Sequence, residues 1–218
     1  MVDGIVEATG DRALALGSLD ALLRMHVAVH ARDRIFVHAG VVGHRDRAIV
    51  LPSPTMTGKT TLVAALVQAG AVYYSDEYAV LDERGLVHPY AKPLSIRGAD
   101  YYSDVYAADA ERGAAELAAT ERAVESLGGA AGAAPLPVGL IAITRYRPGA
   151  VFRPRQCSAG EGSLALLSNT VPARERPAEA LAVIARAVEK ALVLDGERGD
   201  AAEAASVLLA KAAESAHA

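Results

Sequence analysis

A strand, a loop and the start of a helix follow one another over residues 48–61, and this succession constrains the fold more than any other part of the sequence. The apolar run 48–51 predicts a short strand. After the loop, four apolar residues recur at helical spacing, so we predict an amphipathic helix over residues 59–69 that stops at Gly70. A phosphate-binding loop needs this layout, because successive backbone N–H groups and the positive end of the helix dipole must point at one anion.

The loop matches the pattern G-x-x-x-x-G-K-[S/T] except at its first position, where Ser53 stands between two prolines. In this pattern the lysine reaches the outer phosphates of a nucleotide and the next hydroxyl holds magnesium, which are the positions of Lys59 and Thr60. The prolines remove two amide donors and stiffen the loop. A Gly-Lys-Thr-Thr segment can alternatively be the N-terminus of an ordinary helix. We favour nucleotide binding by seven residues: Ser53, Met56, Thr57, Gly58, Lys59, Thr60 and Thr61.

Further strand signals lie on both sides of this unit. A polar turn at 43–46 precedes the strand 48–51, and a turn at 83–85 separates the two strands of a hairpin. The nearly continuous apolar run 138–144 is typical of a strand covered on both faces. A strand–helix–strand unit followed by an antiparallel pair indicates a mixed sheet. The predicted strands are 35–38, 48–51, 72–74, 78–82, 86–90 and 138–144.

Helical patterns outside these strands define the domain organisation. Ser18 is a candidate N-cap for a helix over 19–31, so residues 1–17 are expected to form a tail or an edge element. The alanine- and leucine-rich helices near the C-terminus have faces for packing or self-association. We therefore predict one α/β domain over 18–218, a mixed sheet flanked by helices. The other predicted helices cover 163–168, 177–194, 200–216 and the first part of 107–134, whose second part is a Gly/Ala-rich flexible loop.

Composition excludes several classes of protein. Hydrophobic residues make up 52% of the 218 residues and charged residues 22%, which excludes a disordered chain. The formal charge of −4 is spread along the chain, and this argues against a nucleic-acid partner. Apolar runs fall far short of the ~18 residues that a membrane span requires. With Cys157 as its single cysteine and no signal-peptide pattern, the chain is expected to be a cytoplasmic protein with no membrane partner.

Three motifs in order resemble the kinase domain of HPr kinase/phosphorylase and its smaller P-loop serine kinase relatives. They are His38-Ala-Gly-Val-Val, the Gly58-Lys59-Thr60-Thr61 loop, and Tyr74-Ser75-Asp76-Glu77. The segment Ser95-Ile96-Arg97-Gly98 is similar to the family's Glu-Ile-Arg-Gly. The resemblance covers residues 19–98 and implies the P-loop α/β fold of the HPr kinase and phosphoenolpyruvate carboxykinase type, with the catalytic core alone and with ATP and Mg²⁺ as its cofactors.

The resemblance also implies a role for individual residues. Asp76 would take the proton from the attacking hydroxyl, with His38 beside it to tune or relay that proton. Lys59 and Arg97 would stabilise the transferring phosphoryl group, and Thr60, Asp76 and Glu77 would hold the metal. Phosphoryl transfer needs such positioning and charge neutralisation more than covalent chemistry. Ser95 stands where the family has a glutamate, so a second metal site and the reverse phosphorylase reaction are not carried over.

Each of these residues also has a plainer interpretation. An acidic pair after a strand can be a solvated turn, and a lone histidine in a strand is more often a core residue than a catalyst. His26 and His30 lack a third metal ligand, and we favour no metal there. Seven of eight tyrosines lie between Tyr73 and Tyr106, where they would line an adenine or acceptor pocket or simply suit strands.

The function that we predict is an ATP-dependent kinase acting on a Ser or Thr hydroxyl of a peptide or small protein. The alternatives are a small-molecule kinase on the same fold and a nucleotide-binding or assembly module without transfer activity. Family members form oligomers, so the resemblance also allows a homo-oligomer.

Overall fold

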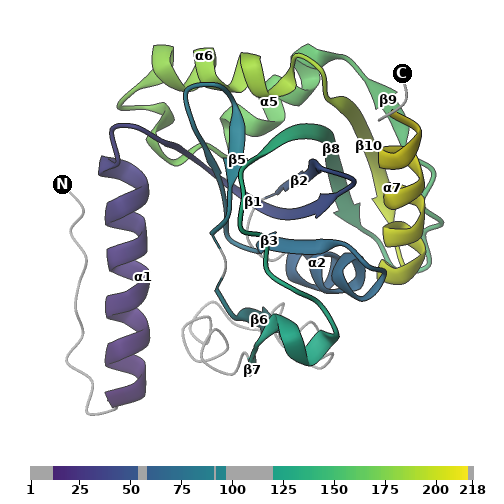
Figure 1. Cartoon of the computed structure of the whole chain (residues 1–218), viewed down its shortest axis with the longest axis horizontal. Helices are drawn as coiled ribbons and strands as arrows, with labels where there is room; N and C mark the ends of the chain where they lie inside the picture. Colours follow the sequence, from purple (N-terminus) through teal and green to yellow (C-terminus); the bar gives the residue numbers. More distant parts are fainter. Residues whose placement is uncertain (1–11, 54–57, 91, 97–119, 216–218) are drawn as a thin grey trace.

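The computed structural model describes residues 12–53, 58–90, 92–96 and 120–215 (Figure 1). Its main sheet has eight strands and is mixed, in the order β2-β1-β4-β5-β8-β10-β9 with β3 also beside β1; β6 and β7 form a separate pair. The strands are β1 (Ile35–His44), β2 (Arg47–Pro52), β3 (Val72–Ser75), β4 (Tyr78–Leu81), β5 (Leu86–His88), β6 (Leu94–Ile96), β7 (Thr120–Arg122), β8 (Leu136–Tyr146), β9 (Arg155–Cys157) and β10 (Leu192–Arg198).

The helices lie around this sheet. The α-helices are α1 (Arg12–His30), α2 (Lys59–Gln68), α5 (Ala159–Ser168), α6 (Pro177–Val188) and α7 (Ala201–Ser215), and two short 3₁₀ helices are η2 (Val124–Leu127) and η3 (Val171–Ala173). The predicted α/β fold with a mixed sheet flanked by helices is confirmed. No helix among the described residues has the length and apolar character that crossing a membrane requires.

Strand β1 organises the sheet because its two halves have different partners. Its second half forms an antiparallel hairpin with β2, closed by Arg45 and Asp46, which both have positive φ. Positive φ at both central residues is the signature of a type I′ turn, whose twist matches that of paired strands. Its first half pairs with β4, while β3 pairs near Val41. The strand thus brings the end of β2 and the β3–β4 turn to the same place.

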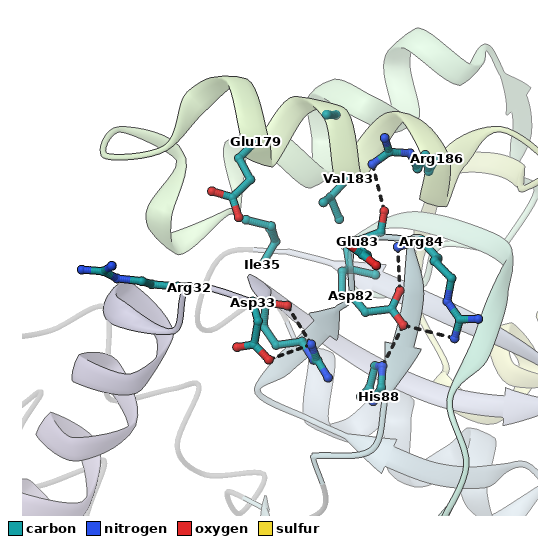
Figure 2. A pocket seen from close by; sticks show the side chains of 13 residues that line it. Arg32, Asp33, Ile35, Asp82, Glu83, Arg84, His88, Glu179, Val183 and Arg186 are labelled. Atoms are coloured by element: carbon teal, nitrogen blue, oxygen red, sulfur yellow. Dashed lines mark hydrogen bonds and ion pairs between the residues drawn. The ribbon is translucent and has the colours of Figure 1, made fainter.

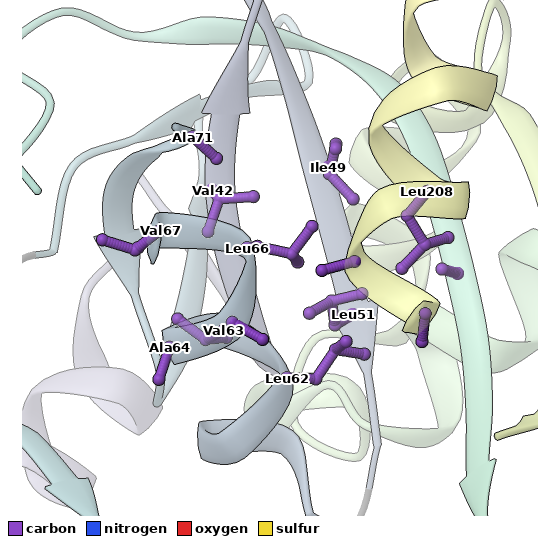
Figure 3. Packing of buried hydrophobic residues seen from close by; sticks show 14 of the residues in the cluster. Val42, Ile49, Leu51, Leu62, Val63, Ala64, Leu66, Val67, Ala71 and Leu208 are labelled. Atoms are coloured by element: carbon purple, nitrogen blue, oxygen red, sulfur yellow. The ribbon is translucent and has the colours of Figure 1, made fainter. Parts of the chain in front are cut away.

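Strand β8 lies between two parallel partners, β2 and β10, and carries the core across the sheet. On one face, α2 and α7 pack on β2 and β8, as Figure 3 shows for Leu62, Leu66 and Leu208 against Ile49 and Leu51. On the other face, α5 and α6 cover β8 and β10. The strand 138–144 is therefore covered on both faces, as its apolar run predicts.

Three predicted boundaries are wrong. The helix over 177–194 ends at Val188, and the residues from Leu192 to Arg198 form β10, because pairing with β8 and β9 outweighs the alanine-rich helical propensity that precedes them. Helix α1 begins at Arg12, so Ser18 lies inside it and caps nothing. His38 lies in the middle of β1 instead of at its end. Of the helix and loop predicted over 107–134, residues 107–119 lie outside the described residues, and 120–122 form a strand.

Candidate functional site

The loop after β2 ends at Gly58, which starts α2 in the left-handed conformation, with φ of 77°. This conformation is strained for any residue with a Cβ atom, so glycine is the residue that the turn requires. It directs the first turn of α2, with Lys59 and Thr60, toward the middle of β1 and the β3–β4 turn. The backbone at the start of a helix presents free N–H groups and the positive end of its dipole.

Lys59 is buried, with 9% of its surface exposed, and its side chain runs over β1. Gly40 makes this path open, because a Cβ atom there would lie 3.1 Å from Lys59 Cγ and 2.6 Å from Val63 Cγ2. The Lys59 amine ends 3.0 Å from Nδ1 and 3.3 Å from Nε2 of His38. His38 lies two residues before Gly40, on the same face of β1. Burial lowers the pKa of Lys59 to about 8, against the raising effect of Asp76 and Glu77.

His38 links this lysine to the loop. Its Nδ1 lies 3.0 Å from the carbonyl oxygen of Ser53, the last described residue before the loop. A ring that donates from Nδ1 to this carbonyl leaves Nε2 to accept a hydrogen bond from the Lys59 amine. Burial and the charge of Lys59 lower the pKa of His38, so the ring is neutral near pH 7. The structure therefore places His38 where it orients Lys59 and the loop entry.

Asp76 lies opposite Lys59 and Thr60, and only 6% of it is exposed. Its Oδ2 atom is 3.4 Å from the Thr60 hydroxyl, and its Oδ1 atom is 3.3 Å from the Tyr73 hydroxyl. The single hydroxyl hydrogen of Tyr73 is shared with the carbonyl oxygen of Lys92, the nearer acceptor at 2.8 Å, and burial with the nearby Asp76 charge raises the pKa of Tyr73 far above the usual range. Tyr73 thus stays protonated and acts as a hydrogen-bond donor beside the carboxylate.

The turn that carries the acidic pair is held by Ser75. Its hydroxyl oxygen accepts hydrogen bonds from the backbone N–H groups of Glu77 and Tyr78, both at 3.0 Å. Such a side-chain turn fixes the two acids in different directions. The Glu77 carboxylate forms ion pairs with Arg24 of α1 at 3.2 Å and with Lys92 at 3.0 Å. The acidic pair is therefore not a solvated turn: Asp76 faces the loop lysine, and Glu77 faces two cations.

Arg198, at the end of β10, supports the loop from behind. It is 2% exposed, and its Nη2 donates a hydrogen bond of 2.6 Å to the carbonyl oxygen of Gly58. Its guanidinium also lies 5.8 Å from the centre of the Tyr146 ring. Arg198 was not among the predicted site residues. The predicted helix 177–194 took in only the first three residues of β10, and the polar, glycine-containing residues 195–199 were assigned to no element.

The other predicted site residues either lie outside the contacts described above or outside the described residues. Thr61 lies in the first turn of α2 and is exposed. Met56, Thr57 and Arg97 lie outside the described residues. Among the tyrosines, Tyr73 contacts the site, whereas the Tyr74 hydroxyl donates to Ala134. Sequence analysis also missed Lys92 and Arg24, which no motif marks.

The oxygen atoms at this site suit a magnesium–nucleotide complex better than a metal held by protein alone. Within the described ranges, no group of three His, Cys, Asp or Glu side chains is placed to hold a metal ion. Mg²⁺ in nucleotide sites usually takes one or two protein oxygens and completes its shell with phosphate and water. The Thr60 hydroxyl and Asp76 carboxylate fit this use. Glu77 is already engaged by two cations.

A pocket lies elsewhere, between the β4–β5 hairpin, the segment before β1 and α6 (Figure 2). Its volume is about 780 Å³. Its charged side chains pair with one another, as His88 does with Asp82 at 3.0 Å and Arg34 with Asp33 at 2.9 Å. No predicted site residue lines it.

Comparisons with models of known protein families, with curated proteins and with solved structures find no match to this chain. The resemblance to HPr kinase/phosphorylase therefore rests on the sequence motifs and stays a prediction.

Proposed function

We propose that this protein is an ATP-dependent, HPr-kinase-like phosphotransferase that acts on a Ser or Thr hydroxyl of a peptide or small protein. One observation carries the proposal: Lys59, Thr60 and Asp76 converge where β2 gives way to α2. A buried amine, a hydroxyl and a carboxylate at the start of a helix are the groups that a P-loop kinase needs around its phosphates. The motif spacing from His38 to Asp76 supports the same assignment.

Lys59 supplies positive charge at the phosphates. Burial disfavours the ammonium form of Lys59 in the free protein. A negatively charged phosphate beside the amine would stabilise the ammonium form, and this attraction would contribute to phosphate binding. His38 keeps the amine in place by a neutral contact, which adds no competing negative charge. Arg198 holds the Gly58 carbonyl and thereby fixes the direction of the adjacent N–H groups.

Asp76 has the surroundings of a general base. Its Oδ2 atom accepts a hydrogen bond from the Thr60 hydroxyl, the kind of contact that a substrate hydroxyl would make with a base. A base must lie within hydrogen-bond reach of the proton it removes. The Tyr73 hydroxyl on the other carboxylate oxygen orients it. Magnesium, when bound at Thr60 and Asp76, would neutralise charge on the phosphates.

The proposal is tested by MgATP binding and by transfer from γ-labelled ATP. Isothermal titration of the full chain should show saturable, magnesium-dependent binding, and Thr60→Ala should reduce the magnesium dependence. Label should then pass to members of a Ser/Thr peptide library. If the protein bound neither MgATP nor MgADP, the proposal would be contradicted, and the chain would be assigned a role that does not involve a nucleotide.

The Asp76→Asn variant separates binding from transfer. It should bind MgATP with little change but lose most label transfer, because the amide cannot accept the proton. Asp33→Asn is the matched control, since this exposed aspartate pairs only locally with Arg34. Equal loss of binding and turnover in Asp76→Asn would remove it as the base. Label found in metabolites but in no peptide would favour a small-molecule kinase.

A further inference from the structure

Helix α1 turns an apolar surface to solvent. Figure 1 shows it standing beside the main body, with its N-terminal half away from the labelled strands and helices. Large apolar side chains are exposed at eleven positions among the described residues, and six of them lie on this one helix. The six are Leu16, Leu19, Leu22, Leu23, Met25 and Val27, with exposed fractions from 45% to 56%.

The helix contacts the body through its opposite side. Ala28 is fully buried and packs with Phe36 and Tyr78. Leu19 and Leu23 lie nine and five residues before Ala28, which places them about 180° and 140° away around an α-helix. The four exposed leucines of α1 therefore face outward, and Met25 and Val27 lie at the flanks, about 60° and 100° from Ala28. In a surface helix of an isolated domain the arrangement is normally the reverse.

The spacing of the exposed residues suits a helix–helix seam. Leu16, Leu19 and Leu23 follow the three- and four-residue alternation that lines one edge of a helix and packs into the grooves of another. The six side chains expose roughly 600 Å² of apolar surface, near the upper limit for monomers and close to the ~800 Å² per partner of a stable interface. A two-fold pair of such helices would cover the side that carries the four leucines and leave Met25 and Val27 at its edges.

The charges of α1 favour a protein partner over a membrane. A helix that lies on a lipid surface carries an excess of Lys and Arg along its polar side. On α1, Arg24 instead forms ion pairs with Asp20 and Glu77. The C-terminal helices, which the sequence offered for self-association, bury residues such as Ile184 and Leu208 completely within this chain. Among the helices that the structure describes, α1 alone keeps several large apolar side chains exposed together.

We propose that the outward side of α1 binds the same side of α1 in a second copy of the chain, forming a two-fold dimer. The interface is isologous, so each leucine contributes twice. This inference stands apart from the proposed kinase function, since no site residue contributes to the seam.

Sedimentation velocity of the full chain over 1–100 μM tests the proposal. The wild type should dimerise, and the variant Leu19→Glu/Leu23→Glu should be monomeric with an unchanged circular dichroism spectrum. The control is Leu164→Glu, an exposed leucine on α5 that should leave the dimer intact. The wild-type melting temperature should rise with protein concentration, whereas that of the double variant should not.

Three results would overturn the proposal. A wild type that stays monomeric at 100 μM with the amides of α1 protected from exchange would show that the same chain covers this helix. A dimer that survives the double substitution would use another surface. Binding of the monomer to vesicles of mixed neutral and anionic lipid, lost in the double variant, would assign α1 to a membrane instead.

Discussion

Acidic residues lie at both ends of β4, but the charged and hydrogen-bonding groups around them differ between the two ends. Asp76 and Glu77 precede the strand, and Asp82 follows it. At the far end, burial alone would raise the pKa of Asp82, but hydrogen bonds from His88, Leu86 and Arg84 bring it below the usual range. At the near end, a buried lysine sits beside the acids with its pKa lowered to about 8.

The difference teaches where to look for chemistry. The far end has a pocket of about 780 Å³, but its acid Asp82 is held by hydrogen bonds and ion pairs, and Arg84 beside it is 69% exposed to water. Charges that are matched and solvated stabilise a hairpin and do little else. The near end keeps an amine in an environment that disfavours its charge, a state that a bound anion relieves. A perturbed buried group marks a functional site better than the size of a hollow.

Replacing Lys59 by alanine should have the largest effect on this comparison. Removing one preorganised charge at a phosphoryl-transfer site costs on the order of a hundredfold or more in turnover. ADP release measured with saturating MgATP checks this, with the exposed Lys190→Ala as control. If the turnover of Lys59→Ala stayed within threefold of wild type, the prediction that the Asp76 end of β4 is the functional end would be wrong.

Arg198→Met should weaken MgATP affinity about tenfold, because the Gly58 carbonyl loses a charged hydrogen-bond donor, and should lower the free energy of unfolding by about 2 kcal/mol. Titration calorimetry and urea denaturation measure the two effects. Arg155→Met, at an exposed ion pair on the neighbouring strand, should change neither by much. A purely structural role for Arg198 would lower stability and leave affinity untouched.

The pH dependence sharpens the contrast. Because the pKa of Lys59 lies near 8 in the folded protein and near 10.5 when unfolded, its charge is lost above pH 8, and kcat/KM for MgATP should fall about tenfold per pH unit there. The unfolded chain binds more protons between pH 8 and 10.5, so this residue makes the free energy of unfolding rise over that range. Lys59→Arg, which stays charged, should abolish the decline; a decline that persists would trace to another group.

The smallest effect is expected at the far end. Asp82→Asn removes the charge that His88 and two backbone amides satisfy, and should lower the free energy of unfolding by about 1 kcal/mol. The carboxylate's contribution fades in acid, as pH falls through its lowered pKa. MgATP binding should be unchanged. Thermal melts at pH 7 and pH 3 with parallel calorimetry test this, and a tenfold loss of affinity would show that the two ends are coupled.

Local patterns predicted the framework of the site and failed where distant partners decide. The strand, loop and helix over 48–69 could be predicted because an apolar run, a glycine and helical spacing are properties of neighbouring residues. Strand β10 could not, because its pairing with β8 is set by residues about fifty positions away. Arg198 was lost with that strand. The boundary of α1 was missed because Ser18 suits a cap in isolation.

The site was predicted in the same uneven way. Motif spacing placed Lys59, Thr60 and Asp76 in one group, and the structure brings these three together. It did not indicate that His38 contacts Lys59, because that contact depends on how α2 packs on β1. Nor did it indicate that Glu77 pairs with Arg24 and Lys92, because these pairs depend on where α1 and the segment after β5 lie.

The ion pair between Arg24 and Glu77 joins the protruding helix to the residue next to Asp76. Glu77 directly follows Asp76 in the chain, so a displacement of α1 that breaks this contact would change the electrostatic surroundings of both carboxylates. The Glu77 carboxylate would then keep Lys92 as a cationic partner and exchange the Arg24 guanidinium for water.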